Sequence, residues 1–566
     1  MLFYLPQKYW FFRQKVLEYS QINLSGVMYV EDYMSVELDR ELQKELDELL
    51  VHHSEFNHYK NMIIRAFKFA VKAHEGVKRK TGEDYVMHPI RVAKIMDDIK
   101  ADYETICAAL LHDTIEDVKW VTFDIIQNEF GPSVAKLVNG VTKASIKGAT
   151  KEDEVIKTII DIFFAFIDDP RSILIKLGDR LDNMRSIKGH DNPEKRIAIA
   201  EQTQNIYIPL ARMMSVYEIK ENLERLVFEV IQKDKGLKDL ELLKKEKKML
   251  FEDNDKVMAF IGKVTQTDLI PRILKQYDPK FKLATCDTVK THVNYKFKTY
   301  SQIYEKMQNL KLDNITQIHD LIKISINTYS NEDCYRAMEA ISQYKDNNGE
   351  ALFGKPFYQK DYISREAFNG YQAIHARYYV KSIDRVVQIE YRTFKMRNKA
   401  NHGIASCWNY DYSDPVYDMK QYLYKLPFYG ELIELCCKYE NDTKNNKNKN
   451  QAVQSEINRA FYNELFLIIN KRIGITLDNS VLDELEEPTE VEKNAPRIEE
   501  HQVRNGLTLG EFLRKKHPEY LSDDSTFSIN GAAVPLHYKL KDRDVIKRHS
   551  YNKKKDFQRT MRKKEE

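Results

Sequence analysis

The feature that most constrains the fold is a helical hydrophobic period that continues, almost without interruption, from residue 56 to residue 230. Apolar residues recur there every three to four positions, which places them on one face of each helix. The pattern is clearest in 62–76, 88–99, 104–118, 134–142 and 156–167. Breaks between helices are expected at Gly76, Pro89, Gly131, Pro132 and Pro170. We therefore predict an all-α domain over residues 56–232.

Beyond this domain the period changes, and the chain divides into further parts. The highly charged residues 233–264 predict a helical linker. Strand-like stretches such as 384–393 then mix with helical ones such as 300–310, which predicts an α+β domain over 265–440. The other expected parts are an N-terminal segment of uncertain status (1–55), a polar linker (441–460) with a solvated loop at "NDTKNNKNKN", a small β-rich module (461–550) and a basic tail (551–566).

Composition excludes several classes of protein. The 566 residues carry 89 lysines and arginines against 86 aspartates and glutamates, so no global charge draws the chain to nucleic acid or membrane. No apolar run is long enough to cross a bilayer, and the N-terminus lacks a secretory cleavage site. The six cysteines are scattered without ligand spacing, which argues against a cysteine zinc site. We expect a cytoplasmic protein with no membrane partner.

Four ionisable residues crowd the stretch "LLHDTIED", residues 110–117. On a helix His112 and Asp113 lie about 100° apart and can lean toward one cation, while Glu116 and Asp117 lie about one turn further on. His88 and Asp179 could complete a set of nitrogen and oxygen ligands. Such a set suits a divalent ion that keeps open positions and lowers the pKa of bound water.

Each of these residues also has a simple structural explanation. A single histidine on a helix is most often part of the core, and Asp179 could form an ordinary ion pair with Arg180. Taken together they favour a metal site. Burying Asp113 and Asp179 beside apolar runs costs several kcal/mol unless a cation neutralises them.

These motifs resemble the HD hydrolase domain of the RelA/SpoT (Rel) alarmone enzymes. The resemblance rests on "AHEGVKRKTGEDYVMHPIRVA", "ALLHDTIEDV", "FGPSVAKLVNGVTK" and "ILIKLGDRLDNMRS", which occur in the family's order. It implies removal of the 3′-pyrophosphate from guanosine tetra- and pentaphosphate, usually with manganese. It also implies that His88, His112, Asp113 and Asp179 hold the metal, and that Glu116 and Asp117 position or deprotonate the attacking water.

The resemblance further assigns substrate-binding residues. Arg79, Lys80 and Thr81 match the family's guanosine-phosphate-binding run, while Asn183 and Ser186 match the far wall of the pocket. By composition alone, Arg79 and Lys80 would be a solvated basic turn. Two departures, Asp182 for the usual histidine and Ser186 for the usual threonine, fall outside the metal ligands.

The second domain resembles the family's alarmone synthetase, a nucleotidyltransferase-like fold. The motifs "YSQIYEKM", "IHDLI", "KDYI", "FNGYQAIH", "QIEYRT" and "ANHGIASCW" appear in the expected order. Asp320 matches the magnesium-binding aspartate, Lys298 and Lys306 keep basic positions, and Tyr371 keeps the ring that stacks on guanine, with His375 close behind. These five residues form a vestigial site that could bind a guanine nucleotide or simply preserve the domain's shape.

Several residues that synthesis requires are replaced. Ser325 stands for the arginine that ends the family's "DLLAIR", Tyr358 for the arginine before "KDYI", and Ala367 for a lysine. Where the family reads "VEIQIRT", Gln388 occupies the catalytic glutamate position and Glu390 the glutamine position. An amide cannot accept the hydroxyl proton at neutral pH, so we expect synthesis to be lost.

The last module resembles the family's TGS domain, mainly through "INGAAVPLHYKLKDRDVIKR". This resemblance implies contact with the ribosome or tRNA through that module.

We therefore predict a cytoplasmic, manganese-dependent alarmone hydrolase with a degenerate synthetase domain and a TGS-like module. Three alternatives stay open at this point. They are a bifunctional synthetase and hydrolase, another HD phosphohydrolase with a different nucleotide substrate, and a non-catalytic regulator that senses a guanine nucleotide.

Overall fold

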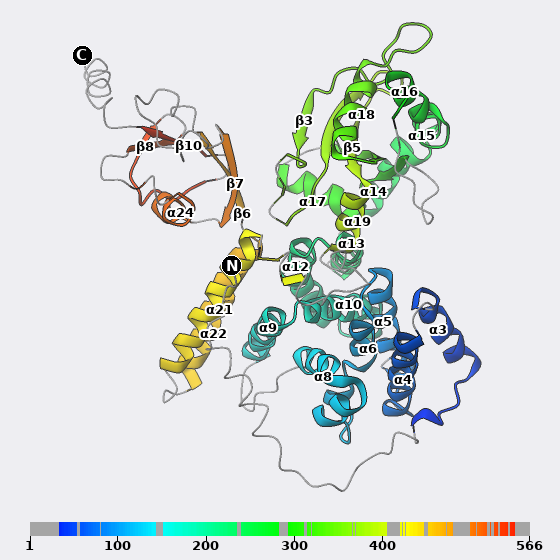
Figure 1. Cartoon of the computed structure of the whole chain (residues 1–566), viewed down its shortest axis with the longest axis vertical. Coiled ribbons are helices and arrows are strands. Elements are labelled where there is room, and N and C mark those ends of the chain that lie inside the picture. Colours follow the sequence, from blue (N-terminus) through cyan, green and yellow to red (C-terminus); the bar gives the residue numbers. More distant parts are fainter. Residues whose placement is uncertain are drawn as a thin grey trace. The chain divides into compact units, whose positions relative to one another are not determined.

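The structure is a computed structural model (Figure 1). It describes residues 33–53, 57–79, 81–142, 151–234, 239–281, 293–310, 314–318, 320–364, 366–367, 369–403, 419–420, 423–424, 426–445, 451–470, 472–478, 498–504, 507–517, 521, 526–529, 532–541 and 544–549. Lys80, the basic tail and residues 1–32 of the N-terminal segment lie outside these ranges. The chain forms two compact units: unit 1 is Met1–Asp97 with Tyr103–Thr142, and unit 2 is Asp98–Asp102 with Lys143–Glu566.

Unit 1 is helical, as its sequence period predicts. Its helices are α3 (Arg40–Leu50), α4 (Asn57–Ala73), α5 (Met87–Asp98, whose last residue belongs to unit 2), α6 (Tyr103–Leu111), α7 (Thr114–Asp117) and α8 (Phe123–Val141). Local signals set the boundaries: the Thr122 side chain caps α8 by accepting from the Ile125 amide. The expected break inside α8 is confirmed, because Gly131 adopts a φ of 87° just before Pro132.

Helix α6 lies at the centre of unit 1, in contact with both α4 and α8. Every residue from Thr105 to Leu111 is buried, which is the pattern of a helix surrounded by protein on all sides. The chain leaves α6 at Leu111 and turns at once into His112 and Asp113, so a fully packed helix positions these two side chains.

Unit 2 begins with a second set of helices. These are α9 (Lys151–Asp168), α10 (Arg171–Arg185), α11 (Pro193–Gln202), a π-helical turn (Thr203–Tyr207), α12 (Ile208–Met213) and α13 (Tyr217–Asp234). The buried guanidinium of Arg171 starts α10 and forms ion pairs with Asp102 at 3.0 Å and Asp169 at 2.8 Å. Asn192 caps α11, with Pro193 in the first turn.

The segment predicted as a helical linker consists of several pieces. They are α14 (Asp239–Lys247), a π-helical turn (Lys248–Glu252) and α15 (Asp255–Thr265), followed by α16 (Leu269–Tyr277). The helix breaks at Asp253, and Asn254 caps α15. Phe251, Val257 and Phe260 belong to the core of the following domain, because the apolar face of this segment packs there. The segment is helical as predicted, but it consists of several helical pieces rather than one continuous helix.

A mixed five-stranded sheet forms the centre of the next domain, with order β1-β2-β5-β4-β3. The strands are β1 (Val293–Phe297), β2 (Ile322–Thr328), β3 (Tyr358–Asp361), β4 (Ile374–Val380) and β5 (Arg385–Thr393), and the helices are α17 (Tyr300–Leu310), α18 (Asn331–Gln343) and α19 (Phe394–His402). Only β2 and β5 pair in parallel. The predicted α+β class is confirmed.

Alternation along β2 separates the two faces of this sheet. Ile322, Ile324 and Ile326 are buried in the core, so Lys323 and Ser325 point to the opposite face. We call that opposite side the open face.

Two helices, α21 (Pro427–Asn445) and α22 (Gln451–Asn470), precede the C-terminal module. The loop predicted for 441–450 is wrong over 441–445, and 451–460 of the predicted polar linker are helical too. The two helices pack on each other, and Tyr439 donates a hydrogen bond to Asn458 Oδ1 at 2.9 Å. This packing outweighs the polar composition of the segment.

The C-terminal module is rich in β-structure, as predicted. Its five-stranded sheet has the order β7-β6-β10-β8-β9, and α24 (Leu509–Lys516) begins with a Thr508/Glu511 capping box. The strands are β6 (Arg472–Asp478), β7 (Ile498–Arg504), β8 (Thr526–Ile529), β9 (Ala532–Val534) and β10 (Val545–His549). Among the described residues, no helix has the length and apolar character needed to span a bilayer.

Candidate functional site

The end of α6 in unit 1 brings three of the predicted metal ligands together. His112 Nε2 lies 3.2 Å from Asp113 Oδ1, and His88 Nε2 lies 3.6 Å from Asp113 Oδ2. The two imidazole rings have centroids 5.1 Å apart. All three side chains are buried, with His88 2 %, His112 1 % and Asp113 9 % exposed. Helix α5 and the turn after α6 thus present nitrogen and oxygen atoms to one small region.

The hydrogen bonding of His112 identifies its free ligand atom. His112 Nδ1 lies 2.8 Å from the Ala109 carbonyl oxygen, and because a carbonyl only accepts, Nδ1 carries the proton. This tautomer leaves a lone pair on Nε2. Nε2 is buried and has no hydrogen-bond partner among the described residues. A backbone-anchored histidine with a bare nitrogen is the arrangement typical of a metal ligand, so these residues fit a divalent ion.

Two further side chains line this cluster, and the sequence reasoning did not find them. The Tyr85 hydroxyl donates to Asp113 Oδ2 at 2.8 Å, and burial together with Asp113 raises the pKa of Tyr85, so it remains a donor. Burial lowers the pKa of His74, despite the opposing charges of Asp113 and Asp117. Tyr85 lies three residues before His88 in "DYVMHP", and this proximity was the available signal.

The predicted acid pair and phosphate-binding residues also lie in unit 1. Glu116 and Asp117 occupy the single turn of α7 and are exposed, so both carboxylates can reach water. Arg79 lies in a tight turn, where its amide donates to the Glu83 carbonyl at 2.8 Å and Gly82 closes the turn with a φ of 86°. Thr81 is exposed in the same turn, while Lys80 lies outside the described residues.

The remaining predicted hydrolase residues lie on α10 in unit 2. Asn183 donates to Asp179 Oδ1 at 2.5 Å, and Lys176 lies 3.6 Å from Asp179 Oδ2. Ser186 donates back to the Asp182 carbonyl at 3.1 Å, at the end of the helix. The alternative explanation of Asp179 as a partner of Arg180 gains no support, because Arg180 stacks on the Tyr207 ring at 4.0 Å.

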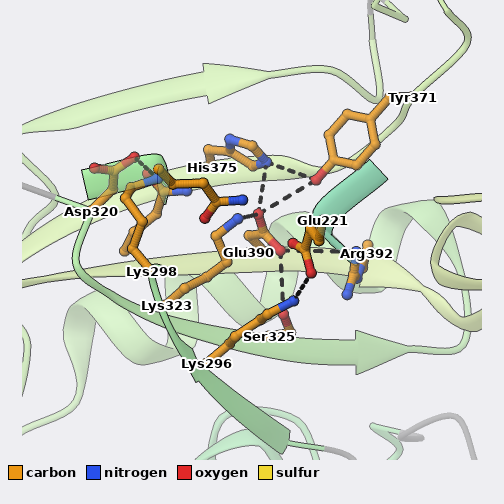
Figure 2. Close-up of polar contacts among 12 residues, drawn as sticks. Glu221, Lys296, Lys298, Asp320, Lys323, Ser325, Tyr371, His375, Glu390 and Arg392 are labelled. Carbon is orange, nitrogen blue, oxygen red and sulfur yellow. Dashed lines mark hydrogen bonds and ion pairs between the residues drawn. The ribbon is translucent and has the colours of Figure 1, made fainter. Parts of the chain in front are cut away.

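The residues predicted to form a vestigial synthetase site belong to two charged groups at the sheet (Figure 2). In the first, Lys306 Nζ donates to both carboxylate oxygens of Asp320 at 2.6 Å, and Lys298 Nζ lies 3.1 Å from Asp320 Oδ2. Burial raises the pKa of Asp320, but the two lysines outweigh it and lower the value to about 2. Burial also lowers the pKa of Lys298. The carboxylate expected to bind magnesium is therefore ionised and held by lysines.

Glu390 is the centre of the second group, which Figure 2 shows as converging dashed lines. Glu390 is 3 % exposed, and its Oε1 lies 2.9 Å from Lys323 Nζ and 3.2 Å from His375 Nε2. Burial raises the pKa of Glu390, but Lys323, His375 and Arg392 together lower it well below its ordinary value. A carboxylate held this strongly in its ionised form is a poor proton acceptor.

Tyr371 and His375 join the same group. The Tyr371 hydroxyl lies 2.9 Å from His375 Nε2 and 3.5 Å from Glu390 Oε1. Burial lowers the pKa of His375 to about 4, so this imidazole is neutral at pH 7. The Glu390 position thus serves as a buried counter-ion within a polar network.

Gln388, at the position of the expected base, bonds to an arginine that the sequence reasoning missed. Arg377 Nε donates to Gln388 Oε1 at 3.2 Å, and its guanidinium lies 4.4 Å from the centre of the Tyr358 ring. Other cations lie beside two of the replaced positions. Lys323 stands two residues before Ser325 on the same face, and Arg377 stands directly across from Tyr358.

Two family models match the parts of the chain that contain these residues. Residues 66–216 match the family described as "HD domain", and residues 295–415 match "Region found in RelA / SpoT proteins". The chain thus carries an HD domain followed by a region found in RelA/SpoT proteins. The first match covers the cluster at the end of α6 and the α10 residues, and the second covers the charged groups of the sheet.

Several relatives with established names align with most of the chain. The guanosine-3′,5′-bis(diphosphate) 3′-pyrophosphohydrolase of Aquifex aeolicus is 30 % identical over 89 % of this chain and 62 % of its own length. The GTP pyrophosphokinase of Myxococcus xanthus is 29 % identical over 86 % and 56 %. The bifunctional (p)ppGpp synthase/hydrolase SpoT of Escherichia coli K12 is 33 % identical over 61 % and 45 %. The chain therefore spans about half to three fifths of their lengths.

Proposed function

We propose that this protein hydrolyses guanosine tetraphosphate, and also the pentaphosphate, to GDP or GTP and pyrophosphate, and that it no longer synthesises them. The observation that carries the proposal is the bare Nε2 of buried His112 beside Asp113. A nitrogen lone pair and a carboxylate buried side by side are costly unless a cation binds there. The proposed substrate is the one in the name of the Aquifex relative.

His88, His112 and Asp113 would hold the metal, and we propose that Asp179 from unit 2 completes the set. Both segments fall within the matched HD domain, residues 66–216. Manganese is the proposed ion, and a bound divalent ion would supply Lewis acidity toward water and a phosphate oxygen. Tyr85 donates to Asp113 Oδ2 and would keep the other oxygen of this carboxylate directed at the ion.

The acid pair of α7 provides the proton chemistry. Glu116 and Asp117 are exposed one turn beyond the buried ligands, where either carboxylate can accept a proton from water. Water attacks the phosphorus attached to the ribose 3′-oxygen, the bond between that oxygen and phosphorus breaks, and pyrophosphate leaves. The 3′-oxygen takes up a proton and becomes a hydroxyl. Arg79, Lys80 and Thr81 would bind the phosphates, and Asn183 and Ser186 are proposed as further substrate-binding residues.

Loss of synthesis follows from the state of the two residues at the open face. Gln388 has no basic oxygen at neutral pH, and Glu390 is engaged by Lys323, His375 and Arg392. Residues 388 and 390 of one strand are about 6.5 to 7 Å apart, so Glu390 would have to leave this network to replace the missing base. The TGS-like module is proposed as a contact for ribosome or tRNA, and the vestigial site as a binding site for a guanine nucleotide.

Two incubations of the purified protein test this function. In the first, guanosine tetraphosphate and manganese should give GDP and pyrophosphate in equal amounts, measured by ion-exchange chromatography. In the second, ATP and GDP with magnesium should give no tetraphosphate. Synthesis in the second incubation would favour the bifunctional alternative, and inactivity in both would favour the non-catalytic regulator.

A matched pair of variants assigns the first reaction to the proposed site. Asp113→Asn should abolish hydrolysis, because the amide keeps the size of the side chain but lacks the charge that binds the ion. Asp124→Asn, in the exposed first turn of α8, should leave it unchanged. Equal activity of both variants would place the reaction elsewhere, and a panel of deoxynucleotides and cyclic dinucleotides would then test for another HD phosphohydrolase.

A further inference from the structure

A short hairpin over residues 77–85 of unit 1 carries the predicted phosphate-binding residues. Lys78 and Asp84 form an isolated antiparallel bridge. One position nearer the turn, the Arg79 amide donates to the Glu83 carbonyl at 2.8 Å. Two pairs of opposed residues therefore follow one another along the hairpin, and each pair places a cation opposite a carboxylate.

The two pairs differ in the partner of the carboxylate. Lys78 Nζ lies 2.8 Å from Asp84 Oδ1, across the hairpin. Side chains opposed in an antiparallel pair lie close enough for such contacts, so the same contact would be expected between Arg79 and Glu83. Instead, the Glu83 carboxylate is directed to Arg91 of α5. Arg91 Nη1 donates to Glu83 Oε1 at 2.7 Å, and Nη2 donates to Oε2 at 2.9 Å.

This two-bond contact is the strong form of an arginine ion pair, because the planar guanidinium matches both carboxylate oxygens. The Arg91 side chain is 27 % exposed and that of Glu83 is 39 % exposed, so protein partly screens the pair from water. Arg91 follows His88 by three residues on α5, which puts both residues on one side of the helix. The helix that supplies a proposed metal ligand thus also holds the hairpin carboxylate.

The alternation of side chains along the hairpin shows which way the Arg79 and Glu83 pair points. Tyr85 lies two residues after Glu83, so these two side chains share a face. Tyr85 directs its hydroxyl to Asp113 of the metal cluster. The face that carries Arg79 and Glu83 is therefore the face toward the proposed site, where a carboxylate beside the arginine would oppose the binding of phosphates.

We propose that Arg91 is a positioning residue for substrate binding. It withholds the Glu83 carboxylate from Arg79, so that the Arg79 guanidinium binds the phosphates of the tetraphosphate. Arg91 acts through Glu83 and does not touch the substrate. The inference rests on the proposed function, in which Arg79 binds phosphate, but it concerns binding alone, and binding is measured separately from hydrolysis.

Calorimetric titration of the full chain with guanosine tetraphosphate in EDTA measures binding without turnover. The original chain should bind saturably at millimolar concentration or below, and absence of binding overturns the proposal. Arg91→Met keeps the aliphatic stem and releases Glu83, so it should weaken binding about 10- to 100-fold, the effect of losing hydrogen bonds to a charged group. The control Arg225→Met removes an arginine that pairs with Glu229 at 2.8 Å on α13, and it should bind like the original chain. Equal losses in both variants would show only net charge and contradict the proposal.

Glu83→Gln separates the proposed role from a purely structural one. If the contact with Arg91 only held the hairpin in place, Glu83→Gln would weaken binding as Arg91→Met does. The proposal predicts the opposite sign. Glu83→Gln should tighten binding about 1.5- to 5-fold, because it removes one partly exposed negative charge beside the phosphates. Added to Arg91→Met, it should restore most of the lost affinity. Weaker binding by Glu83→Gln, or no recovery in the double variant, overturns the proposal.

Arg79→Ala assigns the effect to one guanidinium. It should weaken binding about as much as Arg91→Met, and the two substitutions together should cost little more than either alone, since the released carboxylate then has no arginine to neutralise. Fully additive losses would refute the proposal.

Hydrolysis with manganese, assayed in parallel, distinguishes the inference from the proposed function. Arg91→Met should raise KM and retain kcat, the pattern of lost substrate binding. If the variants show the predicted binding pattern but the original chain does not hydrolyse the tetraphosphate, the proposed function fails and the inference is supported. Hydrolysis by the original chain without that binding pattern overturns the inference alone.

Discussion

Glu390→Gln should destabilise the central sheet of the synthetase-like domain by about 2 to 3 kcal/mol. Breaking a fully buried ion pair by removing one partner costs about 3 to 5 kcal/mol. Glu390 is nearly inaccessible, but the Lys323 side chain is 35 % exposed, so water partly compensates this lysine and the cost falls below that range. The amide keeps the size of the side chain, which leaves the packing of β5 unchanged.

Hydrogen exchange read by mass spectrometry measures this effect within one domain of a multidomain chain. Peptides from β2 and β5 should exchange about 30- to 150-fold faster in Glu390→Gln, since each 1.4 kcal/mol is a factor of ten. Peptides from α4 and α6 should be unaffected. The matched control is Glu305→Gln, an exposed residue on α17, where the expected cost is below about 1 kcal/mol.

A double variant tests whether the cost arises from the unpaired lysine. Lys323→Met combined with Glu390→Gln removes both partners, and it should exchange more slowly than Glu390→Gln alone. If Glu390→Gln exchanges at the rate of the Glu305→Gln control, Glu390 is not a stabilising counter-ion. The argument that it cannot serve as a base would then lose its physical support.

Three further outcomes follow from the same contacts. Tyr85→Phe removes the hydrogen bond to Asp113 and should weaken manganese binding or hydrolysis about 10- to 100-fold, measured by metal titration; an unchanged titration would exclude a positioning role. The pKa of Asp320 falls from 3.8 to about 2 on folding, so the ionised carboxylate stabilises the fold by about 2 kcal/mol above pH 4, and this stabilisation is lost as the pH falls from 3.8 to 2. The difference in stability between the original chain and Asp320→Asn should therefore vanish over this range. A difference that does not change with pH would show that the lysine pairs are weak. Combining Gln388→Glu with Glu390→Gln should not restore synthesis, because Ser325, Tyr358 and Ala367 still replace the family's arginines and lysine. Tetraphosphate formation from ATP and GDP would refute this.

The sequence predicted that His88, His112 and Asp113 lie close together, and it could do so because most of the signals are local. His112 and Asp113 are adjacent, and the six residues before them, 106–111, are all apolar, so the pattern places both side chains at the end of a buried helix. Tyr85 escaped notice because a tyrosine near a histidine carries no signal of its own. Its role depends on where the turn before α5 places the ring, and that is a tertiary fact.

The open face of the sheet shows what single positions cannot reveal. Compared one position at a time with the family pattern, Ser325 and Tyr358 indicate only that two arginines are replaced. Strand register decides which side chains are neighbours, and it brings Arg377 beside Tyr358 and Lys323 beside Gln388. The pairing of strands far apart in sequence cannot be read from composition or period.

The helical segments around residues 441–460 were missed for a related reason. Asparagine and lysine disfavour an isolated helix only weakly, and the contacts between α21 and α22 supply the stabilisation that local propensity lacks. The segment after α13 was similarly predicted as a linker because its charges are conspicuous, whereas its sparse apolar residues are what pack into the core.

The central claim is that water attacks the 3′-pyrophosphoryl group at the cluster formed by His88, His112 and Asp113. The most direct measurement is hydrolysis of guanosine tetraphosphate with manganese in water enriched in oxygen-18, with the products analysed by mass spectrometry. Attack of water on phosphorus should leave one labelled oxygen in pyrophosphate and none in GDP, and Asp113→Asn should give no products. Label in GDP, release of orthophosphate, or full activity of the variant would contradict it.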